Sequence, residues 1–163
     1  MAYWLMKSEP DSFSIDDLGA AGQAPWDGVR NYQARNFMRS MLPGDSFLFY
    51  HSSCQPPGIA GIGEIASQPY PDRAALDPES PYHDAKASEE RLPWVAVNVT
   101  LREKFTTLLA LAEIRQLNGL DELPLLQKGN RLSVMPITAE QWAKLTSAAQ
   151  RGQASGQDQN EQI

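Results

Sequence analysis

Arginines, aromatic rings and an asparagine lie close together between residues 26 and 41, and these side-chain types suit the binding of a nucleotide. Arginines can hold phosphates, rings such as Trp26 and Tyr32 can stack on a base, and the Asn31 amide can bond to a base edge. The alternative is a core helix whose basic face lies in solvent, and the local pattern alone favours it because such faces are common. The stretch is therefore a hypothesis for a binding site, which the rest of the sequence has to support.

A helix is predicted to hold most of these side chains. Its apolar residues recur at helical spacing: Ala34, Phe37, Met38 and Met41. Asn31 suits the N-cap position, and the Pro-Gly pair at residues 43–44 supplies a stop. With the apolar side on a core, Arg35 and Arg39 lie one turn apart on the other side, and Tyr32 lies on the same side as Arg35.

The elements around this helix are predicted from the hydrophobic pattern. Apolar runs and alternation predict strands over residues 2–7, 46–51, 58–66, 94–101 and 131–137. In the third of these, Gly61 and Gly63 lie two apart on one face, which indicates a sharply coiled strand, as in a small barrel. Further helices are expected after the N-cap Ser14, over residues 107–117, and after the capping box at Thr138.

Two segments lack the hydrophobic periodicity of a helix or a strand. Residues 67–93 are rich in proline and are expected to form a long loop, which in a compact domain is either functional or a sign of wrong element boundaries. Residues 150–163 are almost entirely polar, and we expect them to form a disordered tail that follows a single domain over residues 1–149.

Length and charge limit the class of protein. The chain has 163 residues, of which 42% are hydrophobic, and its formal net charge is -6. That charge argues against a protein that coats nucleic acid without specificity, although it is compatible with a local basic cleft. There is no apolar run that could span a bilayer and no secretory signal pattern, so we expect a cytoplasmic location, or a nuclear one in a eukaryote, and no membrane partner.

Motifs of common enzymes are absent from the sequence. It contains no P-loop, dinucleotide glycine fingerprint, metal-spaced histidine cluster or nucleophile elbow. The single cysteine, Cys54, excludes an intrachain disulfide, and no third group is evident to orient it with His51. We therefore expect no catalysis, no cofactor and no metal. The alternative is an enzyme that acts on a modified nucleotide or a small polar metabolite, with Glu9 or His51 as acid or base.

Five segments, which occur in the same order as in the family, resemble the EVE domain of the thymocyte nuclear protein family. They are YWLMKSEP at residues 3–10, WDGVRNYQARN at 26–36, FYHS at 49–52, PGI at 57–59 and LSVMP at 132–136. The resemblance spans residues 2–146. It implies an α+β, PUA-like fold: a strongly bent β-barrel of about five to six strands with flanking α-helices. The sequence departs from the family pattern at residues 75–76 and 82–84, in the long loop.

The resemblance also implies a non-catalytic reader domain, whose partner is DNA or RNA with a modified base held in a concave, aromatic-walled pocket. An RNA-binding accessory of translation or of RNA modification is a further alternative. The residues expected to form the base pocket are Ser8, Trp26, Val29, Asn31, Tyr32, His51 and Ser133. The residues expected to contact phosphate or base are Lys7, Arg30, Arg35 and Arg39.

Each of these residues also has a structural interpretation. Trp26 could belong to the core, Ser133 could cap a turn, and Lys7 could be solvated at the end of its strand. Arg35 could form an ion pair with Asp27 or Asp45. These alternatives stay open at the level of sequence.

Overall fold

The computed structural model describes the backbone of residues 1–161 and the side chains of residues 1–153. The strands are β1 (Tyr3–Ser8), β2 (Gln23–Trp26), β3 (Ser46–His51), β4 (Gly58–Ile65), β5 (Tyr70–Pro71), β6 (Val95–Ala110) and β7 (Val134–Ile137). The α-helices are α1 (Ile15–Ala21), α2 (Tyr32–Arg39), α3 (Leu111–Ile114) and α4 (Ala139–Glu161), and short 3-10 helices cover Arg73–Leu76 and Pro124–Leu126.

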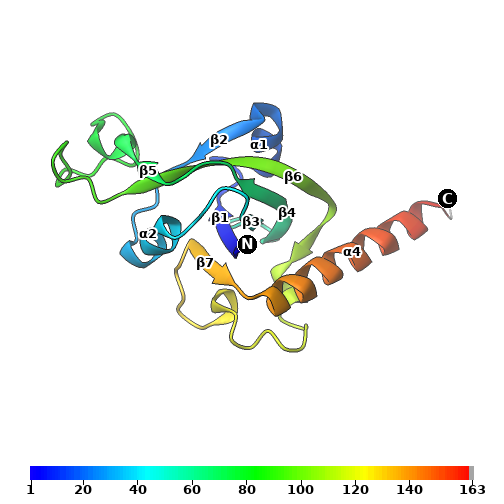
Figure 1. The fold of residues 1–163 in the computed structure, drawn as a ribbon. Coiled ribbons are helices and arrows are strands. Elements are labelled where there is room, and N and C mark those ends of the chain that lie inside the picture. The colour runs from blue at the N-terminus through cyan, green and yellow to red at the C-terminus, as the bar shows by residue number, and fades with distance from the viewer. Residues whose placement is uncertain (162–163) are drawn as a thin grey trace.

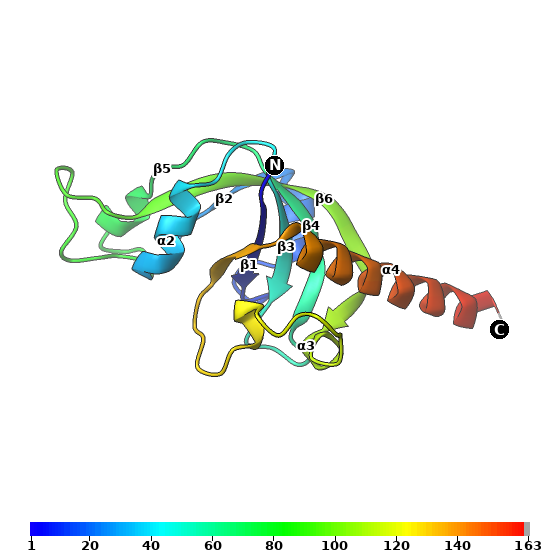
Figure 2. The same cartoon turned by 60° about the horizontal axis from the view of Figure 1, so that its bottom comes forward.

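The described strands form one curled, mixed sheet. Its order is β2-β6-β4-β3-β1-β7, with β5 paired to β6; the β1–β3 pair is parallel and the other pairs are antiparallel. The long strand β6 arches across the molecule, with α2 at one end of the sheet and α4 projecting from the other (Figures 1 and 2). This confirms the α+β, PUA-like fold, as an open curled sheet of seven strands rather than five or six.

Glycine in β4 allows this curvature. A Cβ on Gly63 would lie 2.3 Å from the ring of Phe47, so only glycine lets the two strands approach there. The pairing of β4 with β6 shifts register twice, between Ile59 and Gly61 and between Ile62 and Gly63. Such irregularities bend a strand, as the glycine spacing predicted.

The predicted helix caps are present. Asn31 accepts a hydrogen bond from the Ala34 N–H and begins α2. Ser14 and Asp17 form a capping box for α1, and Thr138 forms one with Gln141 for α4. Strand β3 is buried over Ser46–Tyr50, as its continuous apolar run predicted.

Three segments differ from the sequence prediction. Residues 107–110 belong to β6 rather than to a helix, because Leu109 and Ala110 pair with Ile59 and Gly58, and this pairing overrides the helix-like leucine spacing. Residues 23–26, for which the sequence predicted no strand, form β2 on the edge of β6. Residues 150–161, expected as a disordered tail, continue α4 as far as Glu161, and residues 162–163 lie outside the described part. No described helix combines the length and apolarity that a membrane span requires.

Candidate functional site

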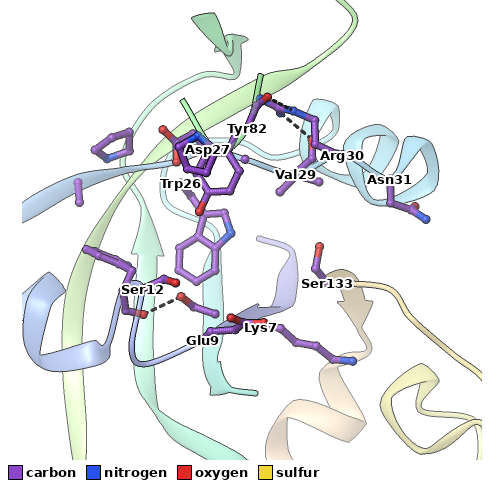
Figure 3. Close-up of a pocket in the computed structure, with 16 residues that line it drawn as sticks. Lys7, Glu9, Ser12, Trp26, Asp27, Val29, Arg30, Asn31, Tyr82 and Ser133 are labelled. Atoms are coloured by element: carbon purple, nitrogen blue, oxygen red, sulfur yellow. Dashed lines mark hydrogen bonds between the residues drawn. The ribbon is translucent and has the colours of Figure 1, made fainter. Parts of the chain in front are cut away.

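A cavity of about 720 Å³ opens beside the end of β1, the start of β7 and the connection from β2 to α2. Its volume falls in the range of about 300–1,000 Å³ that is typical of small-ligand sites. The cavity is lined by Lys7, Ser8, Glu9, Ser12, Phe13, Ala24, Pro25, Trp26, Asp27, Gly28, Val29, Arg30, Asn31, Pro81, Tyr82 and Ser133 (Figure 3). Seven of the predicted site residues are in this set: Lys7, Ser8, Trp26, Val29, Arg30, Asn31 and Ser133.

Trp26 belongs to both the core and the cavity. It is only 6% exposed, and its indole packs edge-on against Phe13, Phe47 and Phe49, with ring centres 6.4, 5.7 and 5.2 Å away. The indole also lines the cavity, so its place in the core is confirmed and its role as a wall for a base stays a prediction. Its surroundings fix the ring orientation, which makes Trp26 a rigid apolar wall.

Tyr82 adds an aromatic ring to those of Phe13 and Trp26 at the cavity, and it comes from the long loop between β5 and β6. Tyr82 lines the same cavity as Trp26 (Figure 3) and is 37% exposed. The ring packs on Gly28, which has φ 79°, and a Cβ on Gly28 would lie 2.6 Å from it. Glycine is therefore required there for both the backbone conformation and the close approach of Tyr82.

Asp72 fixes the loop to the β2–α2 connection. Its carboxylate is 3% exposed and accepts hydrogen bonds from Gly28 N–H at 2.9 Å, Ala74 N–H at 3.0 Å and Arg30 Nη1 at 2.9 Å. Arg30 in turn donates from Nε to the Tyr82 carbonyl at 3.0 Å. A buried carboxylate with several donors is well satisfied, so this network holds Tyr82 in place.

The Arg30 guanidinium lies near two aromatic rings. Its central carbon is 5.9 Å from the centre of the Tyr82 ring and 5.4 Å from that of Trp94. Its Nη2 is buried and has no hydrogen-bond partner among the described residues. The loss of a hydrogen bond costs about 1–3 kcal/mol, and cation–π contacts with the two rings offset part of it.

Burial shifts the pKa of two charged side chains at the cavity, and two polar side chains there make hydrogen bonds to the backbone. Burial raises the pKa of the Asp27 carboxyl, and the nearby Asp72 carboxylate raises it further. Burial lowers the pKa of the Lys7 ammonium, whose nitrogen lies 5.9 Å from the centre of the Tyr50 ring. Ser8 donates to the Phe13 carbonyl and the Asn31 oxygen caps α2, so these two side chains also have structural roles.

Four predicted site residues do not line the cavity. The Tyr32 ring, predicted as a wall, is 59% exposed and packs on Trp94 at 4.7 Å instead. Arg35 and Arg39 donate to the Pro93 carbonyl, and Arg35 pairs with neither Asp27 nor Asp45. His51 was predicted at the base edge, but it accepts a hydrogen bond from the Ile15 N–H at 3.1 Å, which stabilises the start of α1.

The role of His51 predicts a dependence of stability on pH. Burial is the main cause that lowers its pKa, and Lys104 adds to this while Asp16 opposes it. The unfolded chain then binds a proton more readily than the folded one, so the free energy of unfolding falls as pH drops below about 6.5. We expect urea unfolding at about pH 7.5 and about pH 5 to show this loss in the wild type. In His51→Gln, which does not titrate, the loss should be smaller, and an equal loss in both proteins would contradict the assignment.

Sequence reasoning missed Tyr82, Asp72 and Asp27. Tyr82 and Asp72 lie in the proline-rich loop, whose length indicated a functional segment but not which of its residues would contribute. Asp27 lies inside the tryptophan-led stretch but has no pattern that marks it. Their contribution depends on contacts across more than forty residues, such as Gly28 with Asp72.

Comparison with known proteins identifies relatives over nearly the whole chain. The EVE domain family model matches residues 2–148. Human thymocyte nuclear protein 1 is 38% identical over 159 residues, an alignment that covers 86% of this chain and 71% of the human protein. A crystal structure of a Pseudomonas putida protein is 60% identical, with a TM-score of 0.89, and the match covers 91% of this chain and 99% of that one. The crystal structure of human THYN1 protein in complex with 5-methylcytosine containing DNA is 36% identical, with a TM-score of 0.85, and covers 91% of this chain and 98% of that one.

Proposed function

The chain belongs to the EVE domain family, and on this premise we propose that it is a non-catalytic reader that holds a modified nucleobase of DNA or RNA in the cavity between Trp26 and Tyr82. The observation that carries the proposal is the pair of aromatic rings at an open cavity, one fixed by the core and one by the Arg30–Asp72 network. Two rings at one cavity suit a planar heterocycle, which gains about 1–3 kcal/mol from each stacking contact.

The modification and the base edge are read by different parts of the cavity. A methyl group gains about 0.8 kcal/mol on burial, which corresponds to about a fourfold preference, and the apolar wall of Trp26 and Phe13 is suited to receive it. A carboxyl group can accept a hydrogen bond from the exocyclic amine of cytosine. Asp27 lines the cavity and is the acidic group we assign to this contact.

The human relative was crystallised with 5-methylcytosine containing DNA, so 5-methylcytosine is the first base to test here. Fluorescence anisotropy should be measured with matched oligonucleotides that carry cytosine or 5-methylcytosine, and adenine or N6-methyladenine, each as single strand and duplex. We expect tighter binding of a modified strand, with weaker binding where the base must first leave a duplex, because flipping costs a few kcal/mol. Equal affinity for all strands would refute the reader function.

An enzyme in the same cavity is the competing proposal. Glu9 lines the cavity, whereas His51 does not, and its Nε2 accepts a hydrogen bond from the Ile15 N–H. Incubation with modified nucleosides and oligonucleotides, followed by mass spectrometry, should return the substrates unchanged. A product that is lost in Glu9→Gln would favour the enzyme. Crosslinking in cell extract, with structured RNA recovered in place of modified DNA, would favour an RNA-binding accessory.

Replacing Tyr82 by alanine should weaken binding of the modified strand by about 5- to 150-fold, the effect of one lost stacking contact. The free energy of unfolding should change little, since the ring is 37% exposed. Tyr82→Phe keeps the ring and is the matched control, with affinity close to that of the wild type. Unchanged affinity in Tyr82→Ala would remove Tyr82 from the site.

A further inference from the structure

Two arginines of α2 converge on one carbonyl oxygen outside the cavity. Arg35 Nη1 lies 3.2 Å from the Pro93 oxygen, and Arg39 Nη2 lies 3.4 Å from the same atom. The ion pairs among the described side chains all involve other cations, so neither guanidinium has a carboxylate partner there. In a chain of net charge -6, this is a local positive site without its anion.

Neighbouring side chains hold the Arg35 guanidinium in position. Arg35 donates from Nε and Nη2 to the Asn36 side-chain oxygen, at 3.2 and 2.8 Å, and its guanidinium lies 4.8 Å from the centre of the Tyr32 ring. These contacts hold the guanidinium in one orientation. Arg39 makes a single hydrogen bond among the described residues, so its remaining N–H groups are available. Two adjacent like charges repel, and an anion bound between them would relieve that repulsion.

A continuous stack joins this site to the cavity. The Tyr32 ring lies between Arg35 and Trp94, with centres 4.8 and 4.7 Å away, and Trp94 lies 5.4 Å from the Arg30 guanidinium, which holds Tyr82 at the cavity. Trp94 is itself fixed, because its indole N–H donates to Asp84 at 2.8 Å. These contacts connect the Arg35 guanidinium to the loop that carries Tyr82.

We propose that Arg35 and Arg39 bind one backbone phosphate of the same nucleic-acid strand whose modified base occupies the cavity. This inference rests on the proposed function and adds to it which backbone phosphate, counted from the base in the cavity, the protein binds. A phosphate offers several anionic oxygens, and the N–H groups of the two guanidiniums that are not bonded to Asn36 or Pro93 can donate to them. The protein then recognises a nucleotide within a chain, one linkage on one side of the base being held by α2, rather than a free nucleoside.

A methylphosphonate scan tests the register. Each linkage near the modified base is made neutral in turn, and affinity is measured for the wild type and for Arg35→Gln/Arg39→Gln. We expect one linkage, or two adjacent ones, to lower wild-type affinity about tenfold, as for one charge-assisted hydrogen bond. The same neutral linkage should have little further effect in the double variant. In the double variant the slope of log affinity against log salt should fall by about 0.7–0.9.

Arg151→Gln is the control for loss of an arginine charge elsewhere, because it removes one such charge from α4, at the other end of the sheet (Figure 1), and should leave the interference pattern unchanged. A thermal melt checks that the variants are folded. An identical interference pattern in the wild type and the double variant would overturn the phosphate assignment while leaving base selectivity intact. Absence of base selectivity in the wild type would instead refute the proposed function.

Discussion

Replacing Asp72 by alanine should lower the free energy of unfolding by about 3–5 kcal/mol, the usual effect of removing one partner of a buried ion pair. The carboxylate is 3% exposed and accepts from two backbone N–H groups as well as from Arg30. The variant therefore leaves the Gly28 and Ala74 N–H groups without this acceptor, and the Arg30 guanidinium without its carboxylate. Binding of the modified strand should be lost as well, since Arg30 and Gly28 no longer hold Tyr82 at the cavity. Urea unfolding and anisotropy measure the two effects.

Glu89→Ala is the matched control in the same loop. Its ion pair with Arg73 is exposed on both sides, with side-chain accessibilities of 69% and 65%. Exposed pairs of this kind contribute about 0–1 kcal/mol. A small, similar loss of stability in both variants would show that the loop does not depend on Asp72.

Replacing Trp26 by alanine should lower the free energy of unfolding by about 3–5 kcal/mol, because a large buried ring is removed from a packed cluster. It contacts Phe13, which precedes α1, and Phe47 and Phe49, which both lie on β3. At a temperature where the variant is still folded, its preference for the modified base should disappear.

Trp26→Phe separates stacking from folding. It keeps an aromatic ring at the cavity, so it should retain part of both the stability and the selectivity. Selectivity that survives in folded Trp26→Ala would remove this ring from the base site. A stability loss below about 1 kcal/mol would show that the ring does not belong to the core.

The sequence predicted α2 well, because a helix cap and helical apolar spacing depend only on neighbouring residues. Asn31 caps α2 as expected, and the apolar spacing of Ala34 and Met38 placed both in the core. The prediction of a helix over residues 107–110, at the end of β6, was wrong because the leucines at residues 108 and 109 are compatible with both helical and strand periodicity. Only pairing with β4 decides between them, and that pairing lies about fifty residues away in the chain.

The composition of the site could be predicted only in part. Three residues singled out by their type, Trp26, Arg30 and Ser133, line the cavity. Tyr32 looked equivalent to Trp26 in sequence, but its ring packs on Trp94, and Tyr82 lines the cavity instead. A loop without a period gives no local signal of which of its side chains will reach a cavity, because long-range contacts such as Arg30 with Tyr82 determine it.

The central claim is that a modified base lies between the rings of Trp26 and Tyr82. The most direct measurement is the NMR signal of a ¹³C-labelled 5-methyl group on a single cytosine of an oligonucleotide, recorded during titration with the protein. Ring currents of the two aromatic side chains should move the methyl proton signal upfield on binding, and the shift should be reduced in Tyr82→Ala. A strand that binds with its methyl signal unshifted would contradict the account.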